Sequence, residues 1–305
     1  MTRHGRGASM NRRTFLAGTG SLLLADAPPA PSRIIDAHTH FYDPTRPQGV
    51  PWPGKSNAIL YKPTLPERFG RLTAPLGVTG TMVIEASNWV EDNQWLLDLA
   101  RDNPVIVGVT GNLDAGIPEF KERLERFAKN PLFRGIRSSS GKLSKSIGDA
   151  HFLSDMERLA GLDLELDIGG GPEMFPGLVR LNDRVPGLRI VINHLPFDPP
   201  RDEQAFRELG KRPAVYAKVS GVLRRKDGVV STELSSYRAP LEELWEVFGP
   251  DRVIYGSNWP VSDMFAPYPD VLRVVAGFFA AKGQPAMEKY FWKNSLAAYK
   301  WIGRT

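Results

Sequence analysis

Cysteine is absent from this chain of 305 residues. Without thiols, the chain can contain no disulfide framework, no thiolate metal site and no cysteine nucleophile. Any metal ion would therefore depend on histidine and carboxylate ligands. Histidine itself occurs at five positions.

A strong excess of charge is lacking as well. The formal net charge is +5 at pH 7, but the first 27 residues hold four arginines against one aspartate, so the remainder carries +2. No basic stripe with interleaved aromatic residues, of the kind that binds nucleic acid, is present. The apolar run near the start of the chain is too short to span a bilayer. We therefore expect a small-molecule substrate, no nucleic-acid partner and no stable membrane span.

The first 31 residues indicate an export signal. Arg12 and Arg13 precede a run of apolar and small residues at 17–25, and a proline-rich stretch follows. This arrangement resembles a twin-arginine signal, and the alternative is a disordered basic tail. We expect an exported, periplasmic protein, with residues 1–31 as signal and linker and residues 32–305 as one folded domain.

Beyond the linker, short β-rich runs alternate with longer amphipathic segments. Most strand-to-strand spacings are close to the ~30 residues of a βα unit, and eight such units suit a closed (β/α)₈ TIM barrel. An open doubly wound sheet would usually carry a glycine-rich loop after the first strand, where this chain has His-Thr-His. The predicted strands are 33–37, 81–85, 105–109, 133–137, 163–167, 189–193, 214–219 and 252–255. Helical patterns include 93–102, 118–130, 154–161, 175–184, 204–211, 240–248 and a closing helix at 285–302.

Two spans are longer than a minimal barrel needs. Residues 41–76 are rich in proline and aromatic side chains, and residues 224–238 lengthen the loop after the seventh strand. Long loops at the carboxyl ends of strands usually shape an active site. The alternative for both is a tolerated surface insertion.

His38 and His40 end the first predicted strand. Because residues two apart on a strand share a face, we expect both imidazoles to face the mouth of the barrel. Two neutral ring nitrogens aimed at one point suit a divalent cation such as zinc. The alternative is a pair of histidines packed in a polar loop.

Three motifs resemble a known family. Residues 36–53 read DAHTHFYDPTRPQGVPWP, residues 191–198 read VINHLPFD, and residues 253–262 read VIYGSNWPVS. In this order they resemble the amidohydrolase-related (amidohydrolase 2) family, in the lactonase branch of the amidohydrolase superfamily. The resemblance implies a (β/α)₈ barrel of the metal-dependent-hydrolase type that acts on lactones of small sugar acids or related cyclic esters and amides. It places His38, His40 and His194 in the active site, with a final-strand acid as general base or metal ligand.

Two positions depart from that family pattern. The typical GSDWP of the final strand is GSNWP here, so Asn258 occupies the aspartate position, and a neutral amide cannot remove a proton. The fifth strand offers no histidine where many members have one. We therefore expect either one divalent ion, zinc or manganese, held by His38, His40 and Glu85, or a metal-free site.

Another group at a strand end must then accept a proton from water. Glu85 ends the second strand and can serve as base or ligand, or it can be a carboxylate at the start of the following helix. Asp198 and Asp263 are loop carboxylates that can also reach inward. Asp36 shares the predicted face of His38 and fits an orienting role.

Four residues are candidates for substrate binding. Arg137, at the end of the fourth strand, can grip a carboxylate or polarise a carbonyl, or it can form a salt bridge at the rim. Lys218 is either an inward-facing cation or one that extends to the rim. Trp259 can form a wall of the pocket or pack in the core. Asp263 is the fourth candidate for binding the substrate.

The leading hypothesis is a hydrolase in which activated water attacks a lactone carbonyl. A metal ion on His38 and His40 would activate the water or polarise the carbonyl. In a metal-free site, the three histidines and Arg137 would polarise the carbonyl directly. Asn258 would bind the substrate or the water. The alternatives are a decarboxylase or hydratase on the same scaffold, and an exported binding barrel that has lost its activity.

Overall fold

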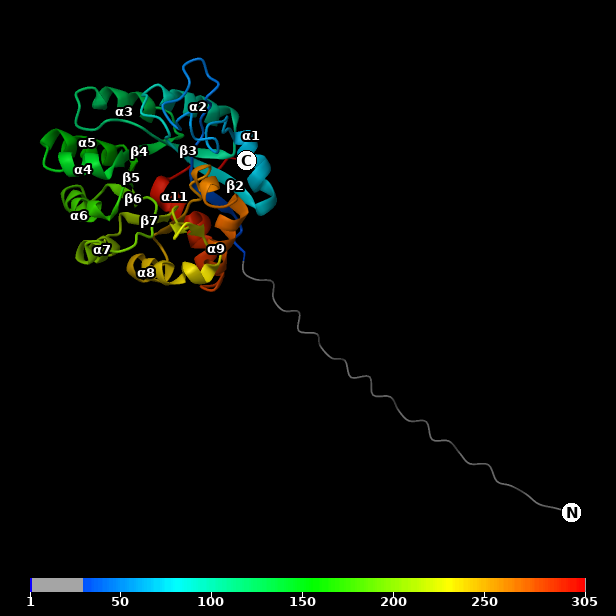
Figure 1. Cartoon of the computed structure of the whole chain (residues 1–305). Coiled ribbons are helices and arrows are strands. Elements are labelled where there is room, and N and C mark those ends of the chain that lie inside the picture. Colours follow the sequence, from blue (N-terminus) through cyan, green and yellow to red (C-terminus); the bar gives the residue numbers. More distant parts are fainter. Residues whose placement is uncertain (2–29, 305) are drawn as a thin grey trace.

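The computed structural model describes Met1 and residues 30–304, so nearly all of the predicted export signal lies outside the described residues. Eight parallel strands follow the order β1-β2-β3-β4-β5-β6-β7-β10 and curl into a barrel (Figure 1). Each predicted strand overlaps an observed one, and the (β/α)₈ prediction is confirmed. The strands are β1 (Ile34–Thr39), β2 (Val78–Ile84), β3 (Ile106–Gly111), β4 (Phe133–Ser139), β5 (Glu165–Gly169), β6 (Arg189–Ile192), β7 (Val215–Val219) and β10 (Val253–Tyr255).

The ends of β1 and β10 meet at the mouth of the barrel. Thr39 forms a parallel bridge with Trp259. The amide of His40 donates to the carbonyl of Trp259 at 2.9 Å, and the amide of Asn258 donates to the carbonyl of His38 at 2.9 Å. Backbone hydrogen bonds thus hold the first and last motifs of the sequence against each other.

Helices surround the barrel (Figure 1). In α6, for example, Phe175, Leu178 and Leu181 are buried at a spacing of three residues, as expected for a helix with one face on a sheet. The structure adds α1, α4 and α9 to the helices named from the sequence. The outer helices are α1 (Pro66–Thr73), α2 (Asp92–Asp102), α3 (Phe120–Ala128), α4 (Ser140–Ser146), α5 (Ala150–Gly161), α6 (Phe175–Arg184), α7 (Glu203–Gly210), α8 (Arg238–Phe248) and α9 (Tyr268–Ala280).

The end of the chain closes the amino-terminal end of the barrel. The predicted closing helix is divided into α10 (Gln284–Glu288), the π-helical turn η5 (Lys289–Lys293) and α11 (Asn294–Tyr299). Tyr299 and Trp301 pack in one buried cluster with the inward-facing apolar side chains of the strands. Figure 1 shows α11 inside the ring of outer helices.

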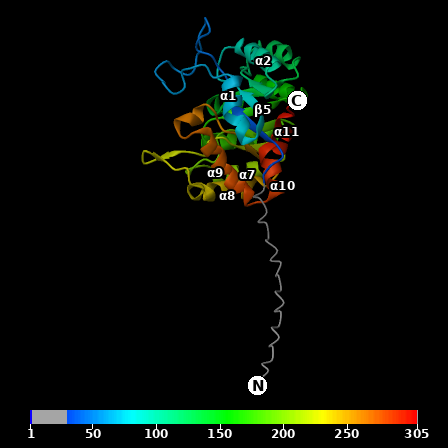
Figure 2. The ribbon, with the colours of Figure 1, turned by 90° about the vertical axis from the view of Figure 1, so that its right-hand side faces the viewer.

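The two long loops lie on the same side of the molecule (Figure 2). Residues 41–76 include α1 and a bridge between Tyr42 and Thr64. Residues 224–238 form a small hairpin, β8 (Arg225–Lys226) with β9 (Val229–Val230). Within residues 30–304, no helix has the length and apolar character that a bilayer crossing needs.

Candidate active site

Three histidines from opposite sides of the barrel meet at its mouth. The ring of His38 lies 5.0 Å from that of His40 and 4.7 Å from that of His194, measured between centroids. His194 lies two residues after the end of β6 and has φ of 63°, and Asn258 lies three residues after the end of β10 and has φ of 60°. Positive φ is uncommon for residues other than glycine, although asparagine, aspartate and histidine adopt it more often than most, so the surrounding structure must hold both turns.

The protons of two of these histidines can be placed from their partners. Nδ1 of His40 lies 2.9 Å from the carbonyl oxygen of Ile84, which can only accept, so Nδ1 carries the proton and Nε2 presents a lone pair. Nε2 lies 3.3 Å from the side-chain amide of Asn258. In His194, Nε2 accepts from the guanidinium of Arg137 at 3.3 Å, which leaves the proton on Nδ1, beside Ser220.

All three imidazoles are neutral at neutral pH. Burial and the positive charge of Arg137 lower the pKa of His40 and that of His194 to about 3. Burial and the ammonium of Lys218 lower the pKa of His38 well below its usual value. The mouth of the barrel therefore offers neutral ring nitrogens beside two fixed cations.

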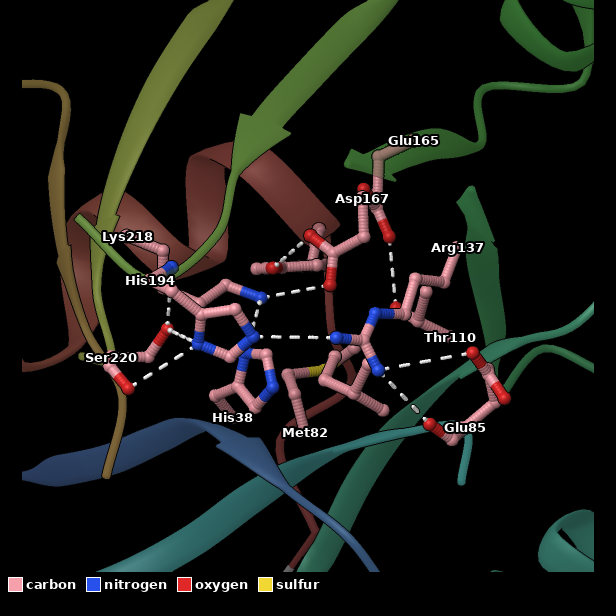
Figure 3. A network of polar contacts seen from close by, with 12 residues as sticks. His38, Met82, Glu85, Thr110, Arg137, Glu165, Asp167, His194, Lys218 and Ser220 are labelled. Atoms are coloured by element: carbon pink, nitrogen blue, oxygen red, sulfur yellow. Dashed lines mark hydrogen bonds and ion pairs between the residues drawn. The ribbon is translucent and has the colours of Figure 1, made fainter. Parts of the chain in front are cut away.

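Glu85 and Arg137 form the opposite wall. Nη1 of Arg137 lies 3.8 Å from the carboxylate of Glu85, and Nη2 contacts His194 (Figure 3). Burial raises the pKa of Glu85, and the charge of Arg137 opposes that rise. The guanidinium thus links the carboxylate at the end of β2 with the histidine at the end of β6.

A cavity of about 510 Å³ opens between these groups. Five of the predicted site residues line it, namely His40, Glu85, Arg137, His194 and Asn258. The long loop contributes Trp52, whose ring lies 5.9 Å from that of His40. Ser87 and Asn88, just after Glu85, also line the cavity. The aromatic and proline content of the loop indicated a wall here that includes Trp52, whereas nothing in the sequence singled out Ser87 or Asn88.

Two predicted substrate contacts lie elsewhere. Trp259 is fully buried, with its ring 5.4 Å from that of Phe69, and it packs behind the site in the core. Asp263 pairs with Arg68 at 3.1 Å and does not line the cavity. We therefore assign Trp259 to packing and Asp263 to an ion pair near the loop.

Lys218 is also separated from the cavity. Its side chain is fully buried and pairs with Asp167 at 2.8 Å, so it faces inward but contacts no open space. Asp167 and Glu165 were not identified from the sequence, although their spacing of two on β5 is that of side chains on one face of a strand. They form a polar layer beneath the histidines.

Two carboxylates considered from the sequence have other partners. Asp198 pairs with Arg224 at 2.8 Å, and 74% of its side chain is exposed. Asp36 accepts from the backbone amides of His38 and Ser257 and from the hydroxyl of Tyr268. It faces α9 instead of sharing a face with His38, because the register of β1 is irregular between Asp36 and Thr39. Asp36 thus orients backbone at the β1–β10 closure.

Comparison with known proteins places the chain in a family. The Amidohydrolase family matches residues 35–301. The chain belongs to the amidohydrolase family. An L-fucono-1,5-lactonase from Burkholderia ambifaria is 30% identical to this amidohydrolase over 244 residues, which cover 77% of this chain and 83% of the relative. An L-fucono-1,5-lactonase from Burkholderia multivorans is 26% identical over 281 residues, covering 86% and 94%. The protein is therefore a hydrolase of this family.

A solved structure shares the fold of this amidohydrolase. The crystal structure of an amidohydrolase from Burkholderia multivorans with bound zinc aligns with a TM-score of 0.77 at 22% identity. The alignment covers 88% of this chain and all of that one, 100%. The barrel is thus a known architecture of the family.

The donor set of this amidohydrolase does not fit a bound metal ion. Among residues 30–304, no three histidine, aspartate or glutamate side chains are arranged to hold one. Nε2 of His194 already accepts from Arg137, and Glu85 lies beside the same guanidinium. A divalent cation would also be repelled by the fixed charge of Arg137. The expected ligand set of His38, His40 and Glu85 is therefore not assembled in the described part of the chain.

Proposed function

We propose that this amidohydrolase hydrolyses the lactone of a sugar acid to the open-chain acid, without a metal ion. The observation that carries the proposal is the convergence on one cavity of a neutral imidazole lone pair on His40, the carboxylate of Glu85 and the guanidinium of Arg137. The names of the two Burkholderia relatives support a sugar-acid lactone as the substrate class. They favour hydrolysis over a decarboxylase, a hydratase or an inactive binding barrel.

Glu85 is the stronger of the two available bases. The pKa of His40 is lowered to about 3, whereas burial raises the pKa of Glu85 above its usual value of 4.5. A proton taken from water is therefore held better by the carboxylate than by the imidazole. The lone pair of His40 instead accepts a hydrogen bond from the water and orients it.

The reaction proceeds in two steps. The water oxygen bonds to the lactone carbonyl carbon while Glu85 takes a proton from it, and Arg137 stabilises the oxyanion that forms. When the tetrahedral intermediate collapses, the bond from that carbon to the ring oxygen breaks. The departing alkoxide takes the proton from Glu85, which restores the carboxylate of Glu85 and yields a hydroxy acid; once that acid releases its proton to solvent, its carboxylate can pair with Arg137.

Acid release from a panel of 1,4- and 1,5-lactones of sugar acids, measured against the protein-free rate, tests the proposal. We expect Glu85→Gln to lower kcat by about 10²- to 10⁴-fold, because the amide cannot accept the proton. Glu91→Gln is the matched control, since Glu91 forms an exposed ion pair with Arg126. Undiminished turnover by Glu85→Gln would remove Glu85 from the mechanism, and no turnover of any lactone by the wild-type protein would overturn the proposed function.

We also propose export to the periplasm by the twin-arginine route. The support is the pair Arg12 and Arg13 before a short apolar run. Expression of the full chain in a bacterium, followed by fractionation, tests this. The wild-type chain should reach the periplasm and the double variant Arg12→Lys/Arg13→Lys should stay in the cytoplasm. A wild-type chain found only in the cytoplasm would contradict the proposal.

A further inference from the structure

A buried ionic layer lies directly beneath the three histidines. Nζ of Lys218 donates to Oδ2 of Asp167 at 2.8 Å, and the hydroxyl of Tyr299 donates to Oδ1 at 2.8 Å. Lys218, Asp167 and Tyr299 are all fully buried. Both oxygens of Asp167 are therefore occupied, and Lys218 is fixed in place (Figure 3).

The charges of this layer balance. Glu165 adds a second buried carboxyl group on β5, which accepts from the hydroxyl of Thr110 at 2.8 Å. Burial and the neighbouring Asp167 raise the pKa of Glu165 well above its usual value, which favours its neutral form. One ammonium then faces one carboxylate. Removing either partner would leave an uncompensated buried charge.

The ammonium of Lys218 also reaches His38. Its Nζ lies 3.4 Å from Nδ1 of that ring. An ammonium has donors and no acceptor, so Nδ1 must supply the lone pair. A neutral imidazole carries one proton, which is then placed on Nε2. That atom is buried and has no hydrogen-bond partner among the described residues.

We infer that Lys218, held by Asp167, is a positioning residue that fixes His38 as the Nε2–H tautomer. His38 is buried behind the cavity and does not line it, so its Nε2–H is a hydrogen-bond donor for an oxygen atom that enters between the rings of His40 and His194, and it is neither a base nor a metal ligand. A buried N–H without a partner is unfavourable, and an oxygen of the substrate or its water relieves that cost. Its kinetic consequence rests on the proposed lactone hydrolysis, but the tautomer itself does not.

Nitrogen NMR of the resting protein reads the tautomer directly. The full chain is labelled with ¹⁵N-histidine, and the His38 signals are assigned by their absence in His38→Gln. We expect a protonated Nε2 and an unprotonated Nδ1 that bears the signature of a donated hydrogen bond. A protonated Nδ1 in the wild-type protein would overturn the inference, whatever the behaviour of any variant.

Variants then test whether Lys218 is the cause. Lys218→Met leaves Asp167 unpaired, so we pair it with Lys218→Met/Asp167→Asn, which removes both charges. In the folded double variant, the ¹⁵N signal of Nδ1 in His38 should move to the chemical shift of an unprotonated nitrogen that accepts no hydrogen bond. The kcat should fall about 10- to 100-fold. Lys211→Met, at an exposed lysine that directly follows α7, is the control. An unchanged His38 spectrum in the double variant would overturn the inference. The expected spectra without any lactone turnover would support the tautomer and reject the proposed function instead.

Discussion

Replacing Asn258 by aspartate places a negative charge against the ring of His40. The side-chain oxygen of Asn258 lies 3.3 Å from Nε2 of that ring. At this distance, two opposite unit charges attract by about 5 kcal/mol at an effective dielectric constant near 20. Burying the new carboxylate offsets part of that gain, so a rise of about 1–3 pKa units is expected. The pKa of His40, now about 3, should therefore rise into the range of about 4–6.

The direction of the pKa change in His40 determines the titration that detects it. A higher pKa stabilises the imidazolium, so His40 in Asn258→Asp should gain its proton during acid titration at a pH where the wild-type ring is still neutral. The ¹⁵N shifts of His40 between pH 4 and pH 7 report this. Asn258→Gly is the control, because glycine also accepts the φ of 60° at this position and adds no charge. An unmoved His40 titration in Asn258→Asp would refute the placement of this amide against the ring.

Three further results are expected. Turnover should fall as the pH drops through the pKa of Glu85, which burial raises above 4.5, because the protonated carboxyl cannot accept a proton from water; a flat acid limb would contradict its role as base. Arg137→Met should lower kcat/KM by about 10²- to 10³-fold, with Arg126→Met, at an exposed ion pair outside the cavity, as the control; equal losses in both would point to stability instead of chemistry. Mass spectrometry should find the metal content of the purified protein at background, and prolonged dialysis against a chelator should leave turnover unchanged. A loss of activity that added zinc restores would reject the metal-free route.

The strands and helices could be predicted from the sequence because the buried face of each element requires apolar residues at a regular spacing. The strands of a closed barrel are covered on both faces, so they appear as short runs such as Ile190–Ile192, set apart by amphipathic helices. His38 and His40 were readable for a related reason, since they stand where a strand ends, and His194 was expected in the site from the resemblance to the family. Arg137 and Glu85 followed from the same rule.

The directions of side chains after the strand ends were not readable. Asp36 was expected beside His38, but an irregular register turns it toward Tyr268. Trp259 was expected in the pocket, but it is directed into the core, where Arg68 lies over its ring. Lys218 was expected at the substrate, but its partner Asp167 comes from a strand far away in the sequence. Such choices depend on contacts between distant segments, which no local pattern records.

The closing segment makes the last residues of the chain a late component of the catalytic apparatus. Tyr299 donates to Asp167, and Trp301 packs beneath the strands. A nascent chain that lacks these residues has an unsupported ion pair under His38, even when all eight strands have been synthesised. The ion pair under His38 is therefore completed by residues that come after all eight strands in the sequence, so a truncation or fusion near Tyr299 and Trp301 should disturb the site from below.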